Sequence, residues 1–444
     1  MRVLHTADWH IGRVLHNQPR RIDHERVLAE IVAIARDRRP DLILHAGDLF
    51  DALRPSYEDI TLGLDTLREL AEVAPTVVLC GNHDSPVLFR IFQKLLGPAS
   101  RLRFVDRARL PDAGGILDFP VGDRRLRLAP LPFVHQNRLL EAFEDPAKRT
   151  VTYADRLGDI ESVLRDGLLD GYDPTRDVLL FAAHLHVSGA TYSGSERPLH
   201  VSDVYATRVE HLPVVSYAAF GHIHRPQQLT GTTPGRYSGS PLQLDFGEVG
   251  EKKEVVLVEL EPGDPARIEL VPLASGRRLR RFVGTMPELE ALAPSVGEEI
   301  CLITLNVEAP IVDLSDRVAR LLPEAVVLPI QENVANRRLT TTVEGPSDTG
   351  AEPSLTEFFR EYLEKQGTKG ASADEVLQRF EQTLEALLIE QEPSFPEEAQ
   401  LLADFPEFAE PSSSPPPPAP APAVQTVLQG FESSDGGATP RRRR

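Results

Sequence analysis

Five apolar segments that each end in metal-binding residue types constrain this chain more than any other feature. The clearest of them, Val77–Asp84, starts with a run of β-branched and other apolar residues and ends in Gly-Asn-His-Asp. A run of that length and composition predicts a buried parallel strand. Gly81 permits a tight turn, so we expect Asn82, His83 and Asp84 to leave the strand at its carboxyl end. Open α/β sheets bind their ligands at that end.

Four more segments repeat this design of an apolar run followed by a polar exit. In order along the chain, their exits carry Asp8 and His10, then Asp48, then His184, then His222 and His224. Taken alone, each exit is as well explained by a capping aspartate or a surface histidine. Five such exits in order make that explanation improbable, so the sequence predicts that these side chains meet in one site. Because His186 lies two residues after His184, spacing leaves open which of the two belongs to it.

The first exit shows how two ligands can share one ion. Asp8 and His10 are two residues apart, with Trp9 between them. Alternate side chains of extended backbone point to the same side, so an extended conformation would let both bind one metal while the indole faces elsewhere.

The segments between the first three strands have helical periodicity. Apolar residues recur at helical spacing in 22–38 and in 56–73. The resulting β-α-β-α-β order predicts a parallel sheet with right-handed crossovers. Farther on, 98–135 alternates like sheet, and 237–241 and 253–260 are expected to be closing antiparallel strands. The predicted fold class is α/β, in a layered α+β arrangement: a sandwich of sheets flanked by helices.

Four regions of different character divide the chain. Residues 1–275 form the predicted catalytic domain, and residues 276–350 a small α/β capping domain. Residues 351–392 hold two predicted amphipathic helices, whose apolar stripes either pack on each other or on the preceding domain, or bind a partner protein. Residues 393–444 turn acidic and then rich in proline and serine, a composition typical of a disordered tail.

Charge and composition exclude several classes of protein. The net charge of −19 argues against a chain that binds nucleic acid with a wholly basic surface. The arginines within 277–281 stay open to two interpretations, phosphate contacts or a solvated strand face. The two cysteines imply no disulfide framework, so we expect a reducing cytoplasm. No signal peptide or membrane span is evident. No Walker A motif is present, so the chain is not expected to hydrolyse ATP itself.

The donor atoms at the five exits suit a pair of metal ions. They comprise two carboxylates, one amide and several imidazoles, with no thiolate. This mixture of oxygen and nitrogen favours two Mn²⁺ or similar divalent ions over structural zinc. Two ions ~3.5–4 Å apart can hold a phosphate between them, activate water and offset charge on the leaving oxygen. A histidine outside the ligand set can protonate that oxygen.

Four motifs carry a resemblance to a known family. They are Thr6-Ala7-Asp8-Trp9-His10, Gly47-Asp48-Leu49-Phe50-Asp51, Gly81-Asn82-His83-Asp84 and Gly221-His222-Ile223-His224-Arg225-Pro226-Gln227. With them the chain resembles the calcineurin-like metallophosphoesterases, and within that family the DNA nucleases that act in double-strand-break repair. The resemblance covers about 1–260 strongly and about 277–390 in layout only.

The resemblance implies a role for each residue at the strand exits. It implies one metal ion on Asp8, His10, Asp48 and His224, and another on Asp48, Asn82, His184 and His222. It also implies that His83 is the catalytic proton donor and that Asp84 orients it.

The resemblance further implies an activity and partners. The activity is Mn²⁺-dependent DNA cleavage: degradation of duplex ends in the 3′-to-5′ direction, and endonucleolytic cutting of single strands and hairpins. The partners are DNA and a coiled-coil ATPase, in a heterotetramer that contains a nuclease homodimer. The complex is expected in the bacterial cytoplasm, at the nucleoid when it is bound to DNA.

Two alternatives belong to other functional classes. A stand-alone phosphodiesterase or phosphatase, acting on small or protein substrates, would not need residues 277–390. A non-catalytic scaffold on the same fold would be marked by lost ligands, and no ligand position is lost here. Both features favour the nuclease.

Overall fold

The computed structural model describes residues 1–134, 153–193, 206–309 and 311–334, with six further positions between 359 and 380. The chain divides into two compact units, residues 1–337 with 420–444, and residues 338–419. Of the expected helical segment 351–392, only those six positions are described, and the expected tail 393–444 lies outside the described residues. Within the second unit, the rings of Phe359 and Phe380 stack with their centroids 4.2 Å apart.

The first sheet contains the three strands expected at the start of the chain. Its order is β16-β15-β1-β4-β5-β6. The parallel strands are β1 (Arg2–Thr6), β4 (Leu42–His45), β5 (Thr76–Leu79) and β6 (Leu102–Val105). Strand β15 (Glu254–Glu259) pairs antiparallel with β1, and β16 (Arg267–Pro272) pairs antiparallel with β15. The predicted parallel order and the closing strand at 253–260 are therefore confirmed.

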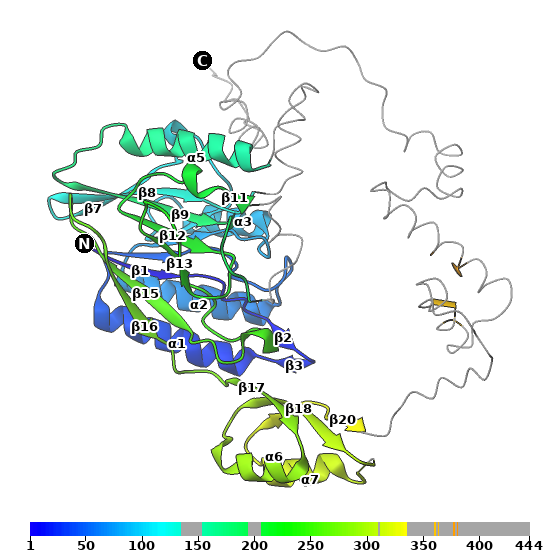
Figure 1. Ribbon diagram of the computed structural model, residues 1–444. Coiled ribbons are helices and arrows are strands. Elements are labelled where there is room, and N and C mark those ends of the chain that lie inside the picture. The colour runs from blue at the N-terminus through cyan, green and yellow to red at the C-terminus, as the bar shows by residue number, and fades with distance from the viewer. Residues whose placement is uncertain are drawn as a thin grey trace, which may run out of the picture. The chain divides into compact units, whose positions relative to one another are not determined.

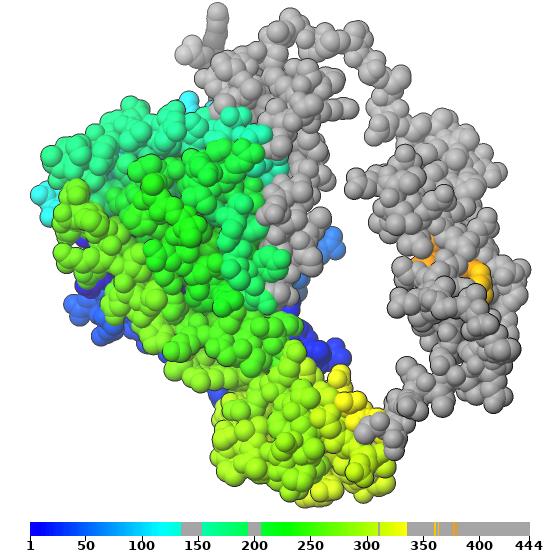
Figure 2. Space-filling view, in the orientation of Figure 1, coloured from blue at the N-terminus to red at the C-terminus, as the bar shows by residue number. Residues whose placement is uncertain are grey.

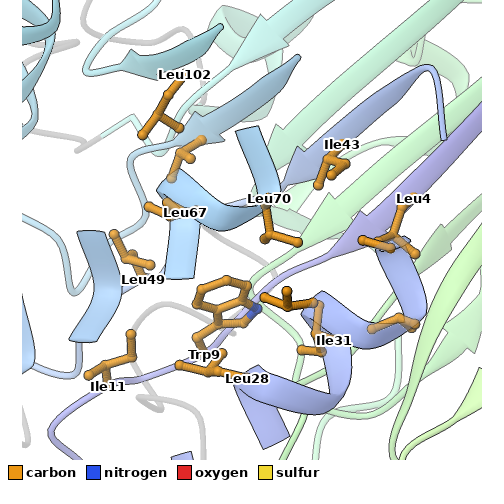
Figure 3. Packing of buried hydrophobic residues seen from close by; sticks show 14 of the residues in the cluster. Leu4, Trp9, Ile11, Leu28, Ile31, Ile43, Leu49, Leu67, Leu70 and Leu102 are labelled. Atoms are coloured by element: carbon orange, nitrogen blue, oxygen red, sulfur yellow. The ribbon is translucent and has the colours of Figure 1, made fainter. Parts of the chain in front are cut away.

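Helices α1 (Arg21–Arg38), α2 (Tyr57–Val73) and α3 (Pro86–Leu96) follow the early strands. Ser56 caps α2 through a reciprocal capping box with Asp59, which fixes where this helix begins. Side chains of α1 and α2 pack with Trp9 and the strand residues Leu4 and Ile43 in one apolar core (Figure 3). This core holds the first sheet and its outer helices as one layer pair.

The second sheet supplies the later metal-binding positions. Its order is β13-β14-β12-β9-β8-β7. Its strands are β7 (Leu117–Val121), β8 (Arg124–Leu131), β9 (Asp177–His184), β12 (Tyr217–Gly221), β13 (Gln227–Gln228) and β14 (Gly235–Tyr237). Strands β8, β9, β12 and β14 are parallel. The antiparallel strand expected at 237–241 is therefore wrong, because β14 ends at Tyr237 and runs parallel to β12.

The two sheets pack face to face, as the predicted sandwich requires. Leu44 and Val77 of the first sheet share a buried cluster with Leu128 and Leu180 of the second. Helices α1 and α2 lie on one outer face, and α5 (Tyr153–Leu169) lies on the other (Figure 1). The short strands β2 (Val14–Leu15), β3 (Gln18–Pro19), β10 (His186–Val187) and β11 (Ala206–Thr207) form two small ribbons. None of the described helices is long and apolar enough to cross a membrane.

Residues 279–334 form a smaller sheet with its own core. Its parallel strands are β17 (Leu279–Gly284), β18 (Ile300–Val307), β19 (Val326–Val327) and β20 (Gln331–Val334), and its helices are α6 (Met286–Leu292) and α7 (Leu314–Leu321). A second cluster joins this part to the larger one through Leu15, Phe246 and Leu279. Figure 2 shows the smaller part in yellow-green beside the larger one.

Candidate metal centre

All nine residues predicted at the strand exits are buried, and the structure brings them together at the carboxyl ends of the two parallel strand sets. They are Asp8, His10, Asp48, Asn82, His83, Asp84, His184, His222 and His224. Three overlapping groups of three ligand atoms within 4.8 Å can be drawn from them: Asp8, His10 and His224; His10, Asp48 and His83; Asp8, Asp48 and His184.

Asp48 lies at the centre of the site. Its Oδ2 atom is 3.5 Å from Nε2 of His10 and 3.4 Å from Nε2 of His184. Its Oδ1 atom accepts a 2.8 Å hydrogen bond from the backbone N–H of His83. One carboxylate oxygen therefore faces one imidazole from each sheet, which is the position that a ligand shared by two ions must occupy.

Asp8, His10 and His224 form one candidate ligand group beside Asp48. The Nε2 atoms of His10 and His224 are 3.1 Å apart. Asp8 Oδ1 accepts a 2.9 Å hydrogen bond from the backbone N–H of His222. Asp8 Oδ2 is buried without a hydrogen-bond partner among the described residues. A buried carboxylate oxygen without a donor is costly unless a cation occupies its free side, so these residues fit a divalent ion.

Asn82 connects the other two histidines. Its Oδ1 atom is 3.0 Å from Nε2 of His184 and 2.9 Å from Nδ1 of His222. Nδ1 of His184 donates a 2.7 Å hydrogen bond to the carbonyl oxygen of Ala46, so Nε2 is left to face the site. His186 lies in β10 and is absent from the ligand groups found among the described residues. Of the two alternatives, the geometry thus places His184 in the site.

The backbone at the exits is turned rather than extended. Four of the site residues have positive φ angles: 55° at Asp8, 46° at His10, 54° at Asp48 and 95° at His222. The expectation that Asp8 and His10 alternate on an extended strand is therefore wrong, because β1 ends at Thr6 and both residues lie in a left-handed turn. Such conformations cost about 1–3 kcal/mol each and persist where the surrounding structure fixes them, typically at functional sites.

Gly81 allows two of these turns to meet. A Cβ atom at this position would lie 2.1 Å from Oδ1 of Asp48 and 2.3 Å from its backbone nitrogen. Any side chain would therefore push Asp48 from the centre of the site, which explains the glycine that precedes Asn82.

His83 is oriented by a residue that the sequence did not indicate. Its Nδ1 atom donates a 2.9 Å hydrogen bond to the carbonyl oxygen of Asp51. The Asp84 carboxylate instead accepts backbone N–H groups of Gly81, Leu49 and Phe50, at 2.9, 3.1 and 2.9 Å. The expectation that Asp84 orients the His83 ring is thus corrected: Asp84 joins the two exit loops, because the tight turn folds its side chain back onto them.

Two further carboxylates stand behind the candidate ligands. Asp51 Oδ1 lies 3.1 Å from Nδ1 of His10, and Glu248 Oε1 lies 3.5 Å from Nδ1 of His224. Lys253 Nζ is 2.6 Å from the other oxygen of Glu248. Carboxylates in this position fix the ring orientation of metal-binding histidines. Asp51 belongs to a motif that the sequence showed, whereas Glu248 lies in a short 3₁₀ turn that carries no signal.

Electrostatics shows that the site lacks positive charge. Burial raises the pKa of the Asp8 carboxyl to about 7, although His184 and His224 oppose the rise. Burial would also raise the pKa of Asp48, but His184 and His83 hold it well below its usual range. The buried carboxylates therefore compete for the same few imidazoles. Divalent cations would remove this competition, which is a second reason why these residues fit metal ions.

Comparison with known proteins agrees with this geometry. The family model described as calcineurin-like phosphoesterase matches residues 1–226. That range contains every predicted site residue from Asp8 to His224. The catalytic domain is thus of a metal-dependent phosphoesterase type.

Curated relatives extend the match beyond this range. SbcD of the nuclease SbcCD from Bacillus subtilis is 33% identical over 304 residues, which cover 64% of this chain and 72% of the relative. The SbcD proteins of Rhodobacter capsulatus and Escherichia coli are 34% and 29% identical, over 66% and 61% of this chain and 75% and 67% of theirs. The chain belongs to the calcineurin-like phosphoesterase family.

Proposed function

We propose that this chain is the nuclease component of an SbcCD-type complex, in which it cleaves DNA together with the coiled-coil ATPase SbcC. It degrades duplex ends in the 3′-to-5′ direction and cuts single strands and hairpins endonucleolytically, in DNA repair and recombination. Its place is the cytoplasm, at the nucleoid when it is bound to DNA. The observation that carries the proposal is Asp48 Oδ2, which lies within 3.5 Å of an imidazole nitrogen from each sheet. The names of its relatives supply the substrate and the partner.

The proposed cofactor is a pair of Mn²⁺ ions. The first would be held by Asp8, His10, Asp48 and His224, and the second by Asp48, Asn82, His184 and His222. Oxygen and imidazole donors without a thiolate suit Mn²⁺. When bound, the pair supplies Lewis acidity toward the phosphodiester and activates water.

His83 is the proposed proton donor to the leaving oxygen. Because its Nδ1–H is bonded to the Asp51 carbonyl oxygen, the ring is fixed and Nε2 is left to hold the transferable proton. After transfer, the neutral ring keeps the Nδ1–H tautomer that this hydrogen bond stabilises. Asp84 contributes by holding the exit loops that carry His83 and Asp48.

A basic groove beside the smaller part is the proposed contact surface for the DNA backbone. It has a volume of about 630 Å³ and is lined by Lys252, Lys253, Arg277, Arg278, Arg280 and Arg281, with Glu251 and Glu299 as the acidic members. Arg277 pairs with buried Asp23, and Arg280 with Glu299. Lys252, Arg278 and Arg281 are exposed and make no ion pair with any described residue.

This division of labour addresses both interpretations of the arginines. Two of them hold the fold, and the others are available to phosphates. Replacing Arg278 and Arg281 together by glutamate should weaken duplex binding and lower the slope of log Kd against log salt by about one for each lost phosphate contact. An unchanged slope would remove this groove from the DNA path.

The proposed division of the chain assigns one role to each region. Residues 1–275 cleave, 276–350 cap the site and contact DNA, 351–392 bind SbcC, and 393–444 form a tail. The complex is proposed to be a heterotetramer around a nuclease homodimer. The capping role is supported by the separate core of the smaller sheet and by the basic groove at its junction with the larger part.

One assay tests the proposed function as a whole. The full chain is incubated with Mn²⁺ and with either linear duplex or hairpin DNA, with and without purified SbcC and ATP. Cleavage of both substrates, loss of cleavage in a chelator, and stimulation on duplex ends by SbcC with ATP are expected. Hydrolysis of small phosphodiesters without any DNA cleavage would instead identify a stand-alone phosphoesterase, and inactivity on all substrates would indicate a scaffold.

A further inference from the structure

Phe133 lies at the rim of the metal centre, two residues after strand β8 ends at Leu131. Its backbone N–H donates a 2.9 Å hydrogen bond to the carbonyl oxygen of Cys80, which directly follows strand β5 of the other sheet. This bond ties the ends of two strands, one from each sheet, and so fixes the position of the Phe133 ring.

The ring lies against two of the candidate metal ligands. Its centroid is 5.8 Å from that of His222, with 27° between the ring planes, and 6.2 Å from that of His184, with 77° between the planes. The Phe133 side chain is half-buried, so part of it is accessible from outside. An apolar surface thus adjoins a site whose nine predicted members are all polar.

We propose that Phe133 is a substrate-positioning residue that stacks on the base of a nucleotide flanking the scissile phosphodiester. This inference rests on the proposed nuclease function and names how that site would hold its substrate. Metal ions attract the phosphate, but they do not fix the nucleotide to which it belongs. A flat ring at the rim does so, because every base has an apolar face that stacks on an aromatic side chain.

The stacking mode also matches the expected substrates. Base–aromatic stacking tolerates any sequence, as an enzyme that degrades DNA ends requires. It needs a base that is free of its own stack, which a frayed end or a single strand provides. The competing explanation is that Phe133 only supports the His222 ring. The two explanations differ in whether the substrate base matters.

The test compares variants of the full chain on single-stranded oligonucleotides that carry one abasic site, placed in turn at each nucleotide around the cut. The variants are Phe133→Leu, which keeps apolar volume but loses the flat ring, and Phe133→Tyr, which keeps the ring. Tyr172→Leu is the matched control, because Tyr172 is also a partly buried aromatic residue but precedes β9 at the opposite end of the sheet. Oligonucleotide affinity, measured by fluorescence anisotropy in Ca²⁺, and Mn²⁺ affinity, measured by calorimetry, accompany KM and kcat.

Stacking predicts a specific pattern of these values. Phe133→Leu should raise the oligonucleotide KM and Kd roughly 5- to 100-fold with Mn²⁺ affinity unchanged, and Phe133→Tyr and Tyr172→Leu should resemble the parent chain. One abasic position should weaken the parent chain by the same factor yet have no further effect on Phe133→Leu. If the abasic site costs Phe133→Leu as much as it costs the parent, or if Mn²⁺ affinity falls with the ring, the proposal is overturned. A parent chain that cleaves no DNA at all would overturn the proposed function instead.

Discussion

Oδ2 of Asp48 lies 3.4 Å from Nε2 of His184, although the two residues follow strands of different sheets. Asp48 comes after β4 in the first sheet, and His184 ends β9 in the second. The contact therefore exists only when the two sheets pack face to face with their strand ends aligned. Folding of the sandwich and assembly of the metal centre are the same event in this chain.

Asp48→Ala should abolish cleavage and weaken the binding of both metal ions, because the Asp48 carboxylate faces the ligands of each. Mn²⁺ calorimetry on the variant measures this directly. Asp173→Ala is a suitable control, since this aspartate has no ligand role and lies exposed near the start of β9. Two ions bound to Asp48→Ala with unchanged affinity would rule out a shared ligand.

His83→Gln should keep both metal ions and lose most of the turnover. A positioned acid contributes about 10²–10⁴-fold, and glutamine cannot replace it. Turnover and Mn²⁺ affinity are measured on the same preparation. His83 also lies close enough to His10 and Asp48 to bind an ion with them. If metal affinity falls together with turnover, His83 is a ligand and not the acid.

The sequence predicted the site better than the reasons for its geometry. Each exit followed an apolar strand, and parallel strands bring their ends to one edge whatever the turn conformation is. The turn itself is decided by tertiary contacts, so extended backbone at Asp8 was the wrong expectation. Glu248 was missed for a similar reason. It reaches His224 only because the chain folds back after β14, and no periodic pattern encodes that contact.

Helix α3 was not among the expected elements, and it carries an apolar face that supports the proposed homodimer. Val87, Ile91 and Leu95 are 58%, 48% and 80% exposed and recur every fourth residue, so they share one side of the helix. An exposed stripe of this kind marks a protein interface. Leu95→Glu should halve the mass seen by light scattering and leave metal affinity intact.

The matched control for that variant is Val312→Glu, because Val312 is 82% exposed in a loop of the smaller part. It should leave the mass unchanged. A Leu95→Glu chain with the mass of the parent would place the dimer interface elsewhere.

Glu161 gives a pH dependence of stability that is independent of the metal centre. It is fully buried, both carboxylate oxygens contact Oγ1 of Thr207 at 3.0–3.1 Å, and burial raises its pKa to about 8 from an ordinary 4.5. Between these pKa values the folded chain keeps a proton that the unfolded chain has released. The stability contributed by protonated Glu161 is therefore present below pH 4.5 and is lost as the pH rises through 8.

Glu161→Gln should remove that loss, because the amide cannot ionise and still accepts a hydrogen bond from Thr207. The difference in unfolding free energy between variant and parent should grow with pH by up to about 1.4 kcal/mol per unit within this window. Urea titrations at pH 5, 6.5 and 8 measure it. Parallel curves for the two chains would show that Glu161 ionises without cost.

The last prediction concerns the segment proposed to bind the ATPase. All nine predicted site residues lie in residues 1–224, and the unit 338–419 contributes none of them. Two of its residues, Phe359 and Phe380, belong one to each predicted helical stripe and stack on each other. This contact favours a helical pair that holds itself together, and such a pair can still present its remaining apolar residues to a groove.

Truncation after residue 350 should therefore leave Mn²⁺-dependent cleavage of single-stranded DNA largely intact. It should abolish association with the ATPase and the ATP-stimulated degradation of duplex DNA, because the chain has no nucleotide-binding motif of its own and must borrow that dependence through contact. Truncation after residue 392 removes only the proline-rich tail and is the matched control, which should keep both properties. Association is measured by co-purification and by sedimentation at several concentrations. Undiminished binding of the chain cut at 350 would move the docking surface into residues 1–350, and equal loss in both truncations would assign it to the tail.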